Sequence, residues 1–165
     1  MDIFEAIKTR RSVRRYVKNA EIPYSHLEQI AGAGRFAPSA RSVNPYRFVI
    51  ITGGERLTGL AGIIGSNGRF LNDASAAIIT VCEDTKYYLE DGCAATENIL
   101  LSAHAFGYGA CWIAGDKKDY CADVLKFVNA PEGYKLISVI SLGVPDENPV
   151  KEKLAAEIAV VKDRF

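Results

Sequence analysis

Residues Cys93–Ala103 have the sequence CAATENILLSA, which is apolar over most of the circumference of a helix. They form the second half of the longest helix that the sequence predicts, at about residues 85–106. A helix with so narrow a polar face is buried on several sides. In a chain of 165 residues, for which one domain is the default, a second subunit could supply part of that cover.

Short, largely apolar runs lie on both sides of this helix. They predict strands at residues 47–52, 76–82, 110–115 and 136–142. The run at 76–82 is apolar except for Thr80, which is typical of a strand buried on both faces.

Shorter helices are expected between the strands. The first would cover about residues 3–9, capped by Asp2, with Ile3, Ala6 and Ile7 facing inward. The second would begin at a capping box at Ser25. The third, interrupted by glycines, would cover residues 55–65. Asp116 would cap a further helix that ends near Phe127. Residues 66–68 would form a turn.

Four strands interleaved with about five helices predict an α/β-class fold, an α+β layered sandwich in which helices flank a mixed sheet of about four strands. The alternation favours some parallel pairing, although strand order does not follow from the sequence. We expect one domain over residues 1–165, with a C-terminal arm at about 146–165.

Charge and composition exclude several classes of function. The 20 Lys and Arg residues balance the 20 Asp and Glu residues, which argues against a nucleic-acid-binding protein. No apolar run is long enough for a membrane span, and no signal peptide is apparent. The four cysteines lack a Cys-x-x-Cys spacing. We therefore expect no metal site and a reducing, cytoplasmic location.

A basic cluster near the N-terminus offers planar bidentate donors and one hydroxyl, which suit a phosphate monoester. Its members are Arg10, Arg11, Ser12 and Arg14. A solvated basic turn is the alternative. The sequence contains no nucleophile elbow, Walker loop or dinucleotide-binding glycine motif. A cofactor, rather than a side chain, is therefore expected to supply the reactive atom.

Several short motifs follow one another in a specific order. They are Arg10–Arg14, Ala37–Ser39, Asn44–Phe48, Asp73-Ala74, Ala95–Ala103, Gly107–Gly109 and Leu142–Pro145. In this order and spacing the chain resembles the nitroreductase family of FMN-dependent oxidoreductases nearly end to end. The resemblance implies the family's fold and a homodimer with FMN at the subunit interface, in which the apolar helix forms the centre.

The resemblance also implies which residues would bind the cofactor. The FMN phosphate and ribityl hydroxyls would be held by Arg10, Arg11, Ser12, Arg14 and, from the C-terminal arm, Lys151 and Lys153. The flavin ring would be contacted by Pro38 and Ser39 of the other subunit, by Asn44, by Asn67 at its pyrimidine edge, and by Trp112, Ile113, Ala114 and Gly115 with backbone amides near N5.

Ordinary structural roles remain as alternatives for these residues. Ser39, Asn44 and Asn67 are common in turns, Trp112 could simply pack in the core, and the two lysines could belong to a solvated tail. Larger family members insert an excursion after the second buried strand, where this chain has only Glu83–Asp91. The resemblance therefore implies an open or differently covered active site.

The implied activity is an FMN-dependent NAD(P)H oxidoreductase. NADH or NADPH would pass a hydride to flavin N5 and leave, and an electron-poor acceptor, such as a nitroaromatic or a quinone, would then be reduced. No side chain need act as acid or base. Two alternatives stay open: a non-catalytic module that stores or senses flavin, and a flavin-dependent biosynthetic enzyme.

Overall fold

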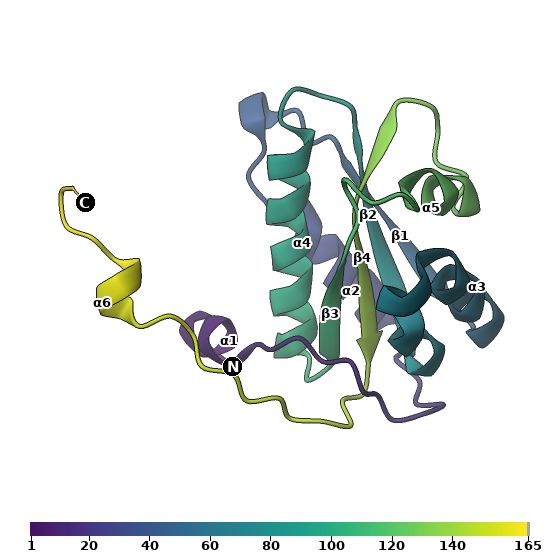
Figure 1. Cartoon of the computed structure of the whole chain (residues 1–165), viewed down its shortest axis with the longest axis horizontal. Helices are drawn as coiled ribbons and strands as arrows, with labels where there is room; N and C mark the ends of the chain where they lie inside the picture. The colour runs from purple at the N-terminus through teal and green to yellow at the C-terminus, as the bar shows by residue number, and fades with distance from the viewer. Residues whose placement is uncertain (165) are drawn as a thin grey trace.

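The computed structural model describes residues 1–164, which form a four-stranded sheet with helices on both faces (Figure 1). The strands are β1 (Tyr46–Thr52), β2 (Ala76–Glu83), β3 (Gly109–Ala114) and β4 (Tyr134–Gly143). Their order in the sheet is β1-β2-β4-β3, and all three neighbouring pairs are antiparallel. The predicted layered fold is confirmed, whereas the predicted mixed pairing is wrong.

The position of β4 explains why no neighbouring strands are parallel. Helix α4 (Tyr88–Ala105) connects β2 to β3, and these two strands run in the same direction because both are antiparallel to β4. Strand β4 lies between them and pairs with each. The alternation of strands and helices therefore produced strands of common direction, but the last strand separates them.

The remaining helices also match the expected pattern in outline. They are α1 (Ile3–Thr9), α2 (Tyr24–Ala33), α3 (Gly54–Ile64), α5 (Cys121–Phe127) and α6 (Ala156–Ala159), with 3₁₀ segments η1 (Gly34–Phe36), η2 (Ala40–Ser42) and η3 (Gly65–Asp73). The expected turn at residues 66–68 lies inside η3, which continues from the end of α3.

Two predicted helix caps are wrong, and each for a local reason. Ser25 lies inside α2, because Pro23 occupies the N-cap position and its restricted φ begins the helix two residues earlier. Asp116 does not cap α5, whose N-cap is Tyr120. The Asp116 carboxylate instead accepts a hydrogen bond from the hydroxyl of Tyr88, at 2.9 Å.

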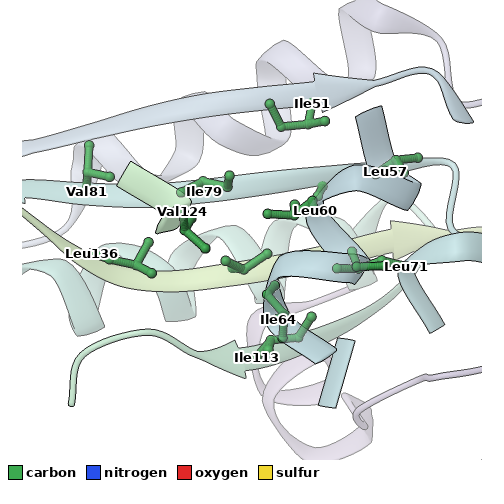
Figure 2. Close-up of a cluster of buried hydrophobic side chains, with 13 residues drawn as sticks. Ile51, Leu57, Leu60, Ile64, Leu71, Ile79, Val81, Ile113, Val124 and Leu136 are labelled. Carbon is green, nitrogen blue, oxygen red and sulfur yellow. The ribbon is translucent and has the colours of Figure 1, made fainter. Parts of the chain in front are cut away.

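Apolar side chains fill both faces of the sheet. On one face α3, η3 and α5 pack against the strands, and Figure 2 shows Leu60 and Ile64 of α3 with Val124 of α5 over the strand residues Ile79 and Leu136. On the other face α2 and α4 cover the strands. Strand β2 is buried from Ala76 to Cys82, as the sequence predicts, because both of its faces are covered.

The two ends of the chain leave apolar side chains in contact with solvent. In α1 only Ala6 is buried; Ile3 and Ile7, which we expected to face inward, are 58% and 54% exposed. The chain after β4 extends away from the sheet past α1 (Figure 1), and its Leu154 is 65% exposed. Position 165, the last of the expected arm, lies outside the described residues.

The helices described between residues 1 and 164 are all too short or too polar to cross a membrane.

Candidate functional site

A cavity of about 200 Å³ opens beside the edge strand β3; we refer to it as the β3 cavity. It is lined by Arg14, Asn67, Phe70, Cys111, Trp112, Ile113, Ala114, Lys118 and Tyr120. These residues come from the basic loop after α1, from η3, from β3 and from the loop that follows β3. The structure therefore brings together five of the residues predicted to contact one cofactor: Arg14, Asn67 and Trp112–Ala114.

Strand β3 offers backbone groups to this cavity because one of its sides has no complete partner strand. The chain after α1 pairs with it only at its start, where Ser12 forms a bridge to Ala110 and the Val13 amide donates to the Ala110 carbonyl at 3.0 Å. From Trp112 onward the outer edge of β3 carries no paired strand within residues 1–164. Such an edge can hydrogen-bond a flat polar ligand.

Two contacts fix the basic loop that brings Arg14 to the cavity. The Tyr16 hydroxyl is buried, donates to the Val13 carbonyl at 2.7 Å and lies 2.7 Å from the Ser141 hydroxyl of β4. Burial raises the pKa of Tyr16 above its usual range. The Glu147 carboxylate accepts from the backbone amide of Arg14 at 2.5 Å. The backbone of the loop is thus held while the Arg14 side chain stays exposed.

A second, basic cavity of about 700 Å³ lies between α1, α4 and the C-terminal arm; we refer to it as the basic cavity. It is lined by Ile7, Lys8, Arg10, Arg11, Glu97, Val150, Lys151, Glu152 and Lys153. Four of the six residues predicted to hold the phosphate and ribityl hydroxyls therefore share one cavity, namely Arg10, Arg11, Lys151 and Lys153. Arg14 lines the β3 cavity instead.

The two arginines of the basic cavity differ in what they already bind. Arg10 Nε donates to the Glu97 carboxylate of α4 at 3.2 Å. Arg11 Nη1 donates to the carbonyls of Lys8 and Arg10, at 2.7 and 2.8 Å, whereas its Nε is buried without a partner in the described chain. A buried donor without an acceptor is costly. Arg11 therefore has a free donor for an anionic ligand.

The loop with Pro38, Ser39 and Asn44 lines neither cavity. The Ser39 hydroxyl accepts a hydrogen bond from the backbone amide of Asn44 at 2.9 Å. The backbone amide of Ala40 donates to the Asp91 carboxylate of α4 at 2.9 Å. Ser12 and Gly115 also line neither cavity, although both adjoin residues that do. Ser12 bridges to the start of β3, and Gly115 is buried against β4.

Four lining residues of the β3 cavity were not predicted: Phe70, Cys111, Lys118 and Tyr120. Cys111 directly precedes the predicted Trp112 and could have been included with it, and burial raises the pKa of its thiol. The other three lie in η3 and in the β3–α5 loop, where no sequence pattern marks them. No cluster of three or more potential metal ligands occurs within residues 1–164.

Comparisons with known proteins agree with this architecture. The model of the Nitroreductase family matches residues 7–92 and 83–144. The chain belongs to the nitroreductase family.

Individual relatives match over almost the whole chain. A protein of Methanothermobacter thermautotrophicus with the name "Putative NADH dehydrogenase/NAD(P)H nitroreductase" is 35% identical over 155 residues, which are 90% of this chain and 80% of that protein. A crystal structure with the same protein name from Bacteroides thetaiotaomicron has a TM-score of 0.91 at 28% identity, covering 98% of this chain and 97% of the other. An FMN-dependent nitroreductase of Clostridium difficile has a TM-score of 0.88 at 27% identity, covering 99% and 100% of the two chains.

Proposed function

We propose that the chain is an FMN-dependent oxidoreductase that takes electrons from NADH or NADPH. The observation that carries the proposal is the β3 cavity, in which Arg14, Asn67 and the Trp112–Ala114 backbone meet. The match to the FMN-dependent nitroreductase of Clostridium difficile, which covers 99% of the present chain, supports the same cofactor.

The donors in the basic cavity fit the phosphate of FMN. The unpartnered Arg11 Nε needs an acceptor, and phosphate oxygens are strong acceptors for guanidinium groups. Lys151 and Lys153 add positive charge from the arm, whereas Glu97 neutralises part of the charge of Arg10. Ser12, in the chain between Arg11 of the basic cavity and Arg14 of the β3 cavity, would meet the ribityl hydroxyls.

The lining of the β3 cavity would hold the flavin ring, which would supply the redox chemistry as a hydride acceptor and donor. The outer edge of β3 from Trp112 to Ala114 and the buried Gly115 would orient the ring through backbone groups, and Asn67 would bond its pyrimidine edge. The role of these residues is to hold the ring in one orientation and to shape the space beside it. No side chain is assigned as acid or base.

We also propose a homodimer with FMN at the interface. Its support is the apolar surface on α1 and the arm: Phe4 is 71% exposed, Val150 90% and Ile158 67%. Ile7 of α1 and Val150 of the arm line the same cavity, and apolar side chains exposed on neighbouring segments are typical of protein interfaces. In the dimer, Pro38 and Ser39 of the partner subunit would reach the flavin, which agrees with their absence from both cavities of their own chain. Asn44, which belongs to the same loop, would sit near the flavin ring.

The dimer predicts a native mass of twice the 18.0 kDa of one chain. A chain ending at Pro149 would lack the exposed arm and two lysines of the basic cavity, so we expect it to sediment as a monomer and to release FMN. Analytical ultracentrifugation with detection of both protein and flavin measures this. A full-length monomer that retains FMN would contradict the proposal.

The acceptor is proposed to be a nitroaromatic or a quinone. The alternative, a flavin-binding module that stores or senses FMN, is favoured by one observation: only residues 84–87 separate β2 from α4, so little chain is available there to cover the ring.

The four cysteine thiols are free, which supports the proposed cytoplasmic location.

Steady-state kinetics distinguish an enzyme from a storage module. Because both substrates would use the same face of the flavin in turn, we expect NAD(P)H oxidation to depend on the acceptor, with parallel double-reciprocal lines when menadione or nitrofurazone is varied. Acceptor-independent, slow oxidation of NAD(P)H by the flavin-loaded protein would instead favour the storage module.

A further inference from the structure

Two cations line the β3 cavity, and the described lining contains no acid. They are Arg14 from the basic loop and Lys118 from the β3–α5 loop. Within residues 1–164 neither side chain has a carboxylate within 4.0 Å, since the ion pairs described there involve other residues. A cavity whose charges are positive and unpaired favours a ligand that carries, or acquires, negative charge.

The loop that carries Lys118 is fastened to the sheet at several points. The Lys118 amide donates to the Gly115 carbonyl at 3.2 Å, closing a turn. The Cys121 thiol donates to the same carbonyl at 2.8 Å, and the Tyr120 hydroxyl donates to the Ala114 carbonyl. These bonds fix the backbone on both sides of Lys118 and direct that residue to the cavity.

A longer-range contact ties the same loop to α4. The hydroxyl of Tyr88, the first residue of α4, donates to the Asp116 carboxylate at 2.9 Å. This hydrogen bond, together with burial, raises the pKa of Tyr88. Asp116, which lies two residues before Lys118, is thereby hydrogen-bonded to α4. The short connection at residues 84–87 places Tyr88 where it can make this contact.

We propose that Lys118 stabilises the negative charge of the reduced flavin and that Tyr88 is the positioning residue that holds its loop. The inference rests on the proposed FMN function. Transfer of a hydride, two electrons and one proton, to a neutral flavin ring leaves one negative charge on the ring. A cation beside the ring therefore favours the reduced over the oxidised flavin and raises the reduction potential.

The test is the midpoint potential of bound FMN, measured with a reference dye under anaerobic conditions. We expect Lys118→Gln to weaken binding of reduced FMN about 10-fold relative to oxidised FMN, which lowers the potential by about 30 mV for a two-electron couple. Lys118→Arg should retain the potential because it retains the charge. Lys117→Gln is the matched control, since Lys117 is exposed and does not line the cavity.

Tyr88→Phe removes only the hydroxyl that bonds Asp116. We expect it to lower the potential in the same direction by a smaller amount, whereas Tyr87→Phe, at the adjacent and exposed tyrosine, should leave the potential unchanged. Equal potentials for Lys118→Gln and the natural protein, with FMN bound to both, would overturn the role of Lys118. Failure of the natural protein to bind FMN would instead overturn the proposed function.

Discussion

Arg11→Gln is expected to weaken FMN binding by about 10- to 100-fold while riboflavin binding stays the same. The Arg11 Nε is a buried donor without a partner in the described chain, and a phosphate would give it a charged acceptor. A hydrogen bond between charged groups contributes about 1.5–3 kcal/mol, and each 1.4 kcal/mol corresponds to about 10-fold in affinity. Riboflavin has no phosphate and should therefore not respond.

The measurement is fluorescence titration of both flavins with the two proteins. Arg15→Gln is a suitable control, because Arg15 is in the same loop but is exposed beside Asp146 and lines neither cavity. Equal losses for FMN and riboflavin would mean that the variant damages the fold rather than the phosphate site. An unchanged FMN affinity would remove Arg11 from that site.

Gly115→Ala should both destabilise the protein and weaken flavin binding. A β-carbon at Gly115 would lie 2.5 Å from the carbonyl oxygen of Ile137 in β4. That oxygen belongs to the backbone, so it cannot move out of contact by a change of rotamer as a flexible side chain can. The end of β3 must therefore move away from β4. We expect a loss of about 1–3 kcal/mol in the free energy of unfolding, as for other overpacked sites, and displaced backbone groups at Trp112–Ala114.

Gly62→Ala is the matched control, because a β-carbon at that exposed position of α3 meets no atom within 4 Å. It should raise the free energy of unfolding by about 0.4–1 kcal/mol. Chemical denaturation and FMN titration of both variants test the comparison. A Gly115→Ala protein with natural stability and natural FMN affinity would show that the β3–β4 contact does not position the flavin edge.

Much of the fold follows from patterns that act locally. The run at Ala76–Cys82, apolar except for Thr80, requires cover on both faces, and the structure places helices on both. The pairing of the strands does not follow, because the insertion of β4 between β2 and β3 depends on the whole chain. Asp116 shows the same limit. Its sequence context suits a helix cap, but its carboxylate accepts a hydrogen bond from the hydroxyl of Tyr88, 28 residues away in the sequence.

The candidate site divides in the same way. Arg14, Asn67 and Trp112–Ala114 were predicted from motifs of the family, and the structure gathers them in one cavity. Lys118, Tyr120 and Phe70 were not, because they reach that cavity through a loop and a 3₁₀ segment whose shapes are set by tertiary contacts. The exposed Ile3 and Ile7 of α1 were expected inside because amphipathic spacing alone does not show what covers the apolar face of a helix.

The most direct test is the visible absorption spectrum of the protein loaded with FMN, recorded without oxygen before and after addition of NADH and then of NADPH. The account predicts a flavin spectrum that is retained through gel filtration and that bleaches with at least one of the two nucleotides. A protein that does not retain FMN, or a bound flavin that neither nucleotide bleaches, would contradict it.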